Sequence, residues 1–287
     1  MGDEGKSASY YFAMNQVGLL PKEELLEVGK KQKSMSFGIP LEREESENRI
    51  PLTPQGVELL VANGHEIVVE SGAGNAANYY DHDFSEAGAK IVTNHEDPFR
   101  CDVVLKVAPP DGEERQLMSP GQLLISLLHL VRQDRNAIQQ LMHRKINALA
   151  YEFLKDDSEC YPVVRSMSEI EGYTAIMIAS EYLSKAKDGK GVLLGGITGI
   201  SPAEVVIIGA GTAGEFAARA ALGLGCQVKV FDNSYRNLRE LERNVGQRLF
   251  TSVLHPQVLS KALKSADAVI GSLRYFDPQS GFLISED

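Results

Sequence analysis

The chain has 287 residues, 43% hydrophobic and 24% charged, which is the composition of a soluble globular protein long enough for two domains. Its net charge of -10 argues against nucleic acid or an acidic membrane as a partner, because phosphate binding depends on clustered Lys and Arg. No apolar run approaches the roughly 18 residues of a membrane span, and because the first residues are acidic and polar we expect no secretory signal. Its three cysteines lack the spacing of a disulfide framework or a zinc site, so we expect reduced thiols and a cytoplasmic protein.

The first half of the chain alternates between strand and helix patterns. Residues 1–36 predict an N-terminal extension with a short helix at 22–28, and residues 37–166 predict a Rossmann-like substrate domain. Strands are expected at 35–40, 66–70, 90–92, 102–107, 122–128 and 147–151. Helices are expected at 54–62, 83–87, 113–117 and 133–143. Such alternation is typical of βαβ units, so we expect an α/β fold with a mostly parallel sheet.

The second half predicts an NAD-binding Rossmann domain over residues 167–287, opening with a linking helix at 167–186 and a glycine-rich loop or hairpin at 189–199. Strands are then expected at 204–208, 227–231, 248–251 and 267–271, with helices at 212–224, 236–244 and 256–266. A doubly wound dinucleotide fold has six strands in the order 3-2-1-4-5-6. Only four strands follow residue 203, so we expect this domain to be truncated at its C-terminal end.

The most informative motif is the run from Glu204 to Gly214, in which a β-branched strand breaks into Gly-Ala-Gly-Thr-Ala-Gly and then into an alanine-rich helix. In a dinucleotide-binding unit Gly209 permits the tight turn, Gly211 lets the backbone approach a pyrophosphate, and Gly214 lets helix and strand pack closely. The helix that begins at Thr212 and Ala213 presents free N–H groups to the phosphates.

The acid expected for such a motif also follows at the expected place. Asp232 ends the second strand 23 residues after Gly209, near the spacing of the acid that takes a ribose 2′-hydroxyl. Asp232 also favours NAD over NADP because a carboxylate repels a 2′-phosphate, although Arg236 lies four residues further on. The structural alternative is a glycine-rich βα turn that binds no dinucleotide.

Three basic side chains of the first domain are unusual for structure alone. Lys106 interrupts an apolar strand, His129 follows another strand, and Arg49 lies in the loop after the first strand. Ligands of open α/β sheets lie outside the carboxyl ends of the strands. An Arg fork suits a carboxylate, Lys polarises a carbonyl oxygen and His exchanges protons near neutral pH. Together they indicate a site for a small 2-oxo acid.

Each of these residues also has a plainer reading. A strand-end lysine often extends its ammonium to water, a histidine after a strand is often structural, and Arg49 lies among glutamates that it could pair with on the surface. The remaining histidines lie in turns or at helix ends, and no pair has metal-ligand spacing on one element. We therefore assign no metal, and the functional reading depends on the convergence of the three basic residues.

Over residues 35–287 the sequence resembles the alanine dehydrogenase and nicotinamide nucleotide transhydrogenase family, closest to the alanine dehydrogenases. The resemblance rests on stretches that follow in the family's order: Gly38-Ile39-Pro40 with Glu42, Asn48 to Pro54, Gly64-His65-Glu66, Gly72-Ala73-Gly74, Leu105-Lys106-Val107, Leu127 to Leu130, Met167 to Ile170, and Gly209 to Gly214. Two positions depart from the pattern. Ala108-Pro109 stands where Lys-Glu is frequent, and Glu171 stands where a small residue is common.

The resemblance implies NAD-dependent oxidative deamination of L-alanine to pyruvate and ammonia, a reversible reaction of amino-acid metabolism. It implies that Arg49 and Lys106 hold the substrate, that His129 is the acid/base, and that Ser168 lies near the nicotinamide and Asp232 on the adenosine ribose. It further implies a homo-oligomer, often a hexamer, and places the family's catalytic aspartate beyond Asp287.

Other functions remain open at this stage. The NAD(H)-binding component of a proton-translocating transhydrogenase shares the fold and the glycine motif, but it requires a membrane partner. A saccharopine dehydrogenase is a weaker enzyme alternative. A cofactor-binding module without catalysis is the non-enzyme alternative, because a chain that lacks the catalytic aspartate should be inactive.

Overall fold

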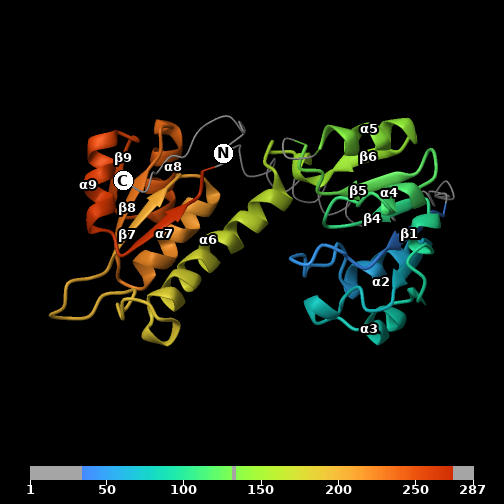
Figure 1. Ribbon diagram of the computed structural model, residues 1–287, viewed down its shortest axis with the longest axis horizontal. Coiled ribbons are helices and arrows are strands. Elements are labelled where there is room, and N and C mark those ends of the chain that lie inside the picture. The colour runs from blue at the N-terminus through green and yellow to red at the C-terminus, as the bar shows by residue number, and fades with distance from the viewer. Residues whose placement is uncertain (1–33, 131–133, 274–287) are drawn as a thin grey trace, which may run out of the picture. The chain divides into compact units, whose positions relative to one another are not determined.

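The computed structural model describes residues 34–130 and 134–273, and Figure 1 shows its elements. The chain divides into two compact units, Met1–Leu105 and Lys106–Asp287. The expected domain boundary between residues 166 and 167 stays a prediction. The expected extension, residues 1–36, lies outside the described residues except for its last three, and Ser36 already belongs to the first strand.

Within the described residues, the first sheet has six strands in the order β3-β2-β1-β4-β5-β6. The strands are β1 (Ser36–Ile39), β2 (Glu66–Glu70), β3 (Lys90–Val92), β4 (Val103–Leu105), β5 (Leu123–Ser126) and β6 (Asn147–Ala150). Strand β1 pairs in parallel with β2 and β4, β2 pairs with β3, and β5 pairs with β6. This is the strand order of a doubly wound sheet. The predicted α/β class is therefore confirmed.

Helices connect these strands, as the alternating pattern predicted. They are α2 (Pro54–Ala62), α3 (Asp81–Glu86), α4 (Glu114–Leu117) and α5 (Arg135–His143), with the 3-10 turns η1 (Asn75–Ala77), η2 (Pro98–Arg100) and η3 (Tyr151–Phe153). Local chemistry explains where the longer ones begin. Thr53 accepts the N–H of Gly56 ahead of a proline in the first turn of α2, and Asp134 accepts the N–H of Asn136 at the start of α5.

The second sheet lies in the second unit and, over the described residues, has four parallel strands in the order β10-β7-β8-β9. Its strands are β7 (Glu204–Ile208), β8 (Gln227–Phe231), β9 (Phe250–Ser252) and β10 (Ala268–Gly271). The helices between them are α7 (Thr212–Gly223), α8 (Tyr235–Val245) and α9 (Pro256–Ser265). Strand order is reversed between β7 and β10, so the carboxyl ends of these two strands form the position where such sheets bind ligands.

Alternate residues of β7 face the two sides of this sheet, and both sides are covered. Val205 and Ile207 belong to a cluster that includes residues of α6, α7 and α8, while Val206 and Ile208 pack with Leu259 and other residues of α9. A parallel strand buried on both faces requires a continuous apolar run. The run of valines and isoleucines in β7 meets that requirement, and the strand fixes the position of the glycine turn that follows it.

The helix α6 (Pro162–Leu183) lies along α7 in the second unit (Figure 1). A Cβ atom on Gly172 would lie 2.4 Å from the carbonyl oxygen of Ala213 and 2.8 Å from the backbone nitrogen of Ala217. Only glycine therefore permits this approach of the two helices. The contact sets α6 against the first turn of α7, the part of the helix that follows the glycine turn.

The predicted linking helix, residues 167–186, is wrong at both ends. The helix begins five residues earlier because Pro162 occupies its first turn, where a proline is tolerated. It ends at Leu183 because Ser184 is extended, and the Ser184 hydroxyl accepts the N–H of Ala186 to cap the following turn η4 (Lys185–Lys187). The glycine-rich stretch 189–199 is a loop, with one isolated bridge between Ile197 and Ile200. In the part of the chain that the structure describes, no helix is both long and apolar enough to cross a membrane.

Candidate functional site

The glycine turn after β7 has the geometry that its three glycines predicted. Gly209 has φ +113°, a conformation that L side chains rarely adopt. A Cβ atom on Gly214 would lie 1.9 Å from the carbonyl oxygen of Gly209, so only glycine lets α7 approach the turn. A Cβ atom on Gly211 would meet nothing within 4 Å and would point into open space. The turn is thus closed on the protein side at Gly209 and Gly214 and open at Gly211.

Helix α7 begins at this open position. Gly211 is its N-cap residue and, as a glycine, has no side chain to cap the first turn. The N–H groups of a first helical turn have no acceptor within the helix, so they suit a ligand. Thr212 and Ala213 occupy the first two helical positions. The positive end of the helix dipole and the backbone N–H groups favour an anion here. A phosphate group is therefore the chemistry that this helix end suits.

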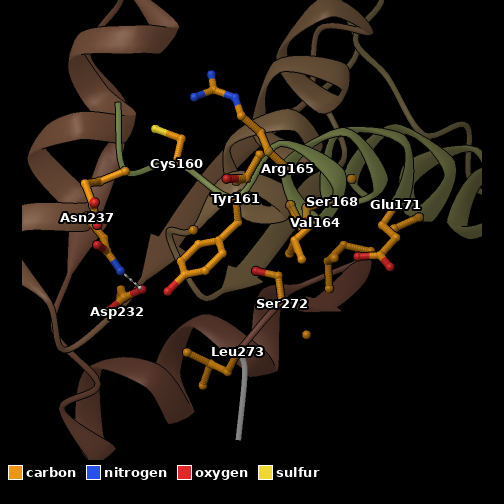
Figure 2. Close-up of a pocket in the computed structure, with 18 residues that line it drawn as sticks. Cys160, Tyr161, Val164, Arg165, Ser168, Glu171, Asp232, Asn237, Ser272 and Leu273 are labelled. Carbon is orange, nitrogen blue, oxygen red and sulfur yellow. Dashed lines mark hydrogen bonds between the residues drawn. The ribbon is translucent and has the colours of Figure 1, made fainter. Parts of the chain in front are cut away.

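A pocket of about 860 Å³ opens over the glycine turn. Figure 2 shows its walls, which come from the start of α6, the start of α7 and the ends of β8 and β10. The predicted residues Ser168, Gly211, Thr212, Ala213 and Asp232 all line it. The volume lies within the range of about 300–1,000 Å³ that is usual for small-molecule and cofactor sites. The structure thus brings the predicted cofactor residues together, with Gly209 and Gly214 shaping the turn behind them.

Asp232 follows β8, is 7% exposed, and its carboxylate is held by the backbone. One oxygen accepts the N–H of Ala210 at 2.7 Å, and the other accepts the N–H of Ser234 at 2.7 Å. The side-chain amide of Asn237 donates to the carboxylate at 3.4 Å, as the dashed line in Figure 2 marks. The acid therefore joins the end of β8 to the glycine turn as well as facing the pocket, a structural role that the sequence did not suggest.

Several other pocket residues were not recognised as site residues from the sequence. They are Glu159, Cys160, Tyr161, Val164, Arg165, Gly172, Ala175, Asn237, Ile270, Gly271, Ser272 and Leu273, with Glu171, which was noted only as a departure from a family pattern. Arg165 donates to Glu169 at 3.1 Å, and this hydrogen bond raises the pKa of its guanidinium. The Ser272 hydroxyl donates to the carbonyl oxygen of Gly209 at 2.8 Å. Only the position of Ser272 directly after a strand end was a signal in the sequence.

Lys106 directly follows β4, but its side chain is 1% exposed rather than extended to solvent. Its ammonium lies 2.9 Å from a carboxylate oxygen of Glu114 on α4, whose side chain is also 1% exposed. The other carboxylate oxygen of Glu114 accepts the N–H of Asp111 at 2.8 Å. A buried ammonium requires such a partner, because an unpaired charge in the interior is costly. The sequence identified the lysine and missed its glutamate.

His129 lies in an exposed turn after β5 and has φ +45°. Its N–H donates to a carboxylate oxygen of Glu152 at 2.8 Å, and the N–H of Leu128 donates to the same carboxylate at 3.0 Å. The histidine thus occupies a left-handed backbone conformation that costs a residue with a Cβ atom roughly 1–2 kcal/mol. The turn is supported from the neighbouring η3.

Arg49, in the first unit, donates to both carboxylate oxygens of Glu47 at 2.7 and 2.6 Å, in a bidentate pair. Burial acts to raise the pKa of Glu47, but the hydrogen bonds and charge of Arg49 outweigh it and lower that pKa below its usual value. The arginine was predicted to bind substrate, and its pairing with a nearby glutamate is the plainer reading noted above. Arg49, Lys106 and His129 are not among the residues that line the pocket over the glycine turn.

No three His, Cys, Asp or Glu side chains in residues 34–130 and 134–273 are grouped as metal ligands. The chemistry of the pocket is instead that of a dinucleotide. A glycine-rich βα turn under an open pocket, with an acid at the end of the second strand, defines an α/β dinucleotide-binding protein.

Comparison with known proteins identifies the family. The N-terminal and C-terminal domain models of the alanine dehydrogenase/PNT family match residues 38–171 and 175–287. An alanine dehydrogenase of Staphylococcus saprophyticus is 38% identical over 88% of this chain and 68% of its own length. An alanine dehydrogenase of Methanococcus maripaludis is 36% identical over the same shares. The chain belongs to the alanine dehydrogenase/PNT family.

Solved structures agree with this assignment. An L-alanine dehydrogenase structure matches with a TM-score of 0.75 and 36% identity, over 82% of this chain and 65% of that one. This chain therefore spans just under two thirds of that structure. A transhydrogenase of Sinorhizobium meliloti matches with a TM-score of 0.71 and 23% identity, which shows a shared fold.

Proposed function

We propose that this chain is an NAD-dependent alanine dehydrogenase, which converts L-alanine to pyruvate and ammonia and catalyses the reverse amination. The observation that carries the proposal is the pocket in which Gly211, the start of α7 and Asp232 meet. The names of the relatives that are 36–38% identical supply the substrate. Alanine and pyruvate are small molecules, in keeping with the acidic chain and its lack of a nucleic-acid signature.

NAD fits the residues that line the pocket. The N–H groups of Thr212 and Ala213 would bind the pyrophosphate, which Gly211 lets approach because it carries no side chain. Asp232 would accept a ribose hydroxyl and disfavour a 2′-phosphate. Ser168, 5% exposed on α6, would lie on the nicotinamide side. These assignments make NAD, rather than NADP, the proposed cofactor.

The substrate would be held and protonated by the three basic residues. The guanidinium of Arg49 would bind the carboxylate, and the ammonium of Lys106 would keep one N–H on Glu114 while another donates to the substrate oxygen. When bound, NAD supplies the acceptor for the hydride that leaves the α-carbon of alanine. His129 would move protons to and from the substrate as water adds and ammonia leaves. One alanine, one NAD and one water thus give pyruvate, ammonium, NADH and a proton.

The oligomeric state and the cellular location of the enzyme are also proposals. Ile170, Met177 and Tyr182 on α6 are 57%, 70% and 69% exposed, and such apolar side chains support a homo-oligomer, which is often a hexamer in this family. The three cysteines, all among the described residues, form no disulfide, which supports a cytoplasmic location. Light scattering of the purified protein would measure the oligomer, and a monomer at micromolar concentration would contradict this part.

The central experiment compares the purified protein with its His129→Ala variant. In the full-length protein, the wild type should oxidise L-alanine with NAD, and the variant should lose most of its turnover while it binds NADH as before. His143→Ala, which removes an exposed histidine at the end of α5, is the matched control and should remain active. Equal turnover of the wild type and His129→Ala would overturn the role of His129.

A second pair of assays separates the proposed enzyme from a transhydrogenase component. The wild type is given pyruvate, ammonium and NADH in one assay, and NADH with an NADP analogue in the other. Reductive amination is expected only in the first. Hydride transfer between nucleotides without amination would contradict the dehydrogenase. NADH binding without either reaction would indicate a cofactor-binding module.

A further inference from the structure

We propose that one turn, Tyr151–Glu152 at the start of η3, positions both Lys106 and His129 for the reaction. The inference rests on the proposed function, because it assigns a role to the surroundings of its two catalytic residues. Neither Tyr151 nor Glu152 carries the chemistry. Each would act through a backbone contact to the segment that does.

Glu152 holds the turn that presents His129. Its carboxylate accepts two consecutive N–H groups, from Leu128 at 3.0 Å and from His129 at 2.8 Å. An ionised carboxylate is the strongest acceptor that a side chain offers, and hydrogen bonds to it are about twice as strong as neutral ones. The φ of His129 is +45°, and an unfavourable backbone conformation of this kind persists only where its surroundings enforce it. Glu152 provides that enforcement.

Tyr151 holds the segment that carries Lys106. Its hydroxyl donates to the carbonyl oxygen of Val107 at 3.0 Å, one residue beyond the lysine. The same carbonyl accepts the N–H of Leu127, also at 3.0 Å, and the N–H of Lys106 donates to Ile125 at 3.0 Å. The backbone on both sides of Lys106 is therefore fixed by the strand that leads to His129 and by Tyr151.

The sheet explains why adjacent residues reach both places. Ser126, the last residue of β5, pairs with Ala150, the last residue of β6. Tyr151 and Glu152 therefore begin directly beyond the strand that lies beside β5, where the chain toward His129 also emerges. Adjacent side chains along an extended strand point to opposite faces. Here the 3-10 turn places the side chains of Tyr151 and Glu152 both on the side of β5. The backbone of these two residues therefore sets the distance between the segment that carries Lys106 and the segment that carries His129.

The two contacts lead to separable kinetic effects. Loss of the Glu152 carboxylate should displace the acid/base, so Glu152→Gln is expected to lower kcat about 10²-fold with little change in KM for alanine. Loss of the Tyr151 hydroxyl should loosen the substrate-holding lysine, so Tyr151→Phe is expected to raise KM about fivefold with a smaller change in kcat. General destabilisation would lower the active fraction, and with it the apparent kcat, in both variants without raising KM, and it would lower the melting temperature. The dissociation constant for NADH should stay unchanged in each.

The experiment measures kcat and KM for alanine in the wild type, Glu152→Gln, Tyr151→Phe and a control, Glu181→Gln, which removes an exposed carboxylate from α6. Glu152→Gln is also combined with His129→Ala. If Glu152 acts through His129, the double variant should be no slower than His129→Ala alone. Hydrogen exchange of the Leu128 and His129 amides is followed in the same proteins, and these amides should exchange faster in Glu152→Gln only.

The outcomes distinguish this inference from the proposed function. A wild type that does not oxidise alanine overturns the proposed function, and the amide exchange still tests the contact with Glu152. An active wild type with unchanged kcat and amide exchange in Glu152→Gln overturns the positioning role. So does an additive loss of activity in the double variant. If Glu152→Gln does not fold, the KM of Tyr151→Phe for alanine tests the inference instead. A KM equal to that of the wild type overturns it.

Discussion

The carboxylate of Asp232 accepts the N–H of Ala210 at 2.7 Å, so the acid at the end of β8 also supports the glycine turn at the end of β7. Asp232→Asn should therefore weaken NADH binding about tenfold or more, because a hydrogen bond to a charged group is worth about 1.5–3 kcal/mol. It should also narrow the preference for NADH over NADPH, since the charge that repels a 2′-phosphate is lost. Titration of nucleotide fluorescence measures both.

The matched control for Asp232 is Asp267, whose carboxylate accepts the N–H of Glu204 at 2.9 Å at the opposite end of β7. Asp267→Asn should lower stability without a change in the dissociation constant for NADH. If Asp232→Asn binds both nucleotides as the wild type does, Asp232 has only the structural role.

Two glycines of the turn should respond differently to the same added methyl group. Gly214→Ala should destabilise the fold, because its Cβ atom would lie 1.9 Å from the carbonyl oxygen of Gly209. Gly211→Ala should leave the melting temperature close to that of the wild type and abolish tight NADH binding, because its Cβ atom meets no protein atom within 4 Å. Gly223→Ala, in open space at the end of α7, should stabilise by about 0.5–1 kcal/mol. Tight NADH binding by Gly211→Ala would contradict the pyrophosphate assignment.

Replacing only one partner of the buried pair Lys106 and Glu114 should lower the stability of the protein more than replacing both. Glu114→Gln leaves the ammonium without its carboxylate and is expected to cost about 3–5 kcal/mol of unfolding free energy. The double variant Lys106→Met with Glu114→Leu should recover much of that loss, because two apolar side chains replace two buried charges. It should nevertheless be inactive with alanine. Chemical denaturation and an alanine assay of the three proteins separate the stabilising role of the pair from the proposed role of Lys106 in holding the substrate.

The three cysteines should differ in reactivity. Cys160 is exposed on the pocket wall, whereas Cys101 and Cys226 are buried. Burial raises the pKa of the Cys101 thiol to about 11, so little thiolate is present at neutral pH. A thiol reagent should modify Cys160 first, and NADH should slow this reaction because the bound cofactor covers the pocket. Mass spectrometry identifies the modified residue, and a modification rate that does not change with NADH would contradict the location of the cofactor.

The pair of Glu47 and Arg49 should contribute stability that is lost in acid. The folded-state pKa of Glu47 is lowered, so the contribution is present above the unfolded-state pKa of about 4.3 and disappears as the pH falls through the folded-state value. Arg49→Gln should therefore be less stable than the wild type at pH 7, by at most about 1 kcal/mol because Arg49 is partly exposed. The difference should vanish in acid, and a constant difference from pH 7 to pH 3 would contradict this origin.

The sequence predicted the second sheet well at positions where the residues are compatible with few backbone conformations. Strand β7 and the helix start at Thr212 follow from an apolar run that breaks into glycines whose backbone needs are local. The start of α6 was missed because Pro162-Val163-Val164 reads as extended chain, although a proline also suits the first turn of a helix. Element boundaries depend on such competing preferences, whereas the order of the elements does not.

The candidate site was predictable to the extent that its chemistry is local. The glycines and Asp232 were found because their spacing along the chain is fixed by one βαβ unit. Glu114 and Glu152 were missed because each gains its role from a partner that the fold brings near. Glu152 reaches His129, 23 residues earlier, only through the register of β5 and β6. Long-range contacts of this kind have no signature in a single sequence.

The close approach at Gly172 also bears on the width of the pocket over the glycine turn. One wall, with Ser168 and Ala175, belongs to α6, and the floor, with Thr212 and Ala213, belongs to α7. The separation of these two helices is set where the absent Cβ atom of Gly172 would meet the carbonyl oxygen of Ala213. The size of the side chain at position 172 therefore limits which ligands the pocket accepts. A methyl group there would push α6 away from α7 and widen the pocket.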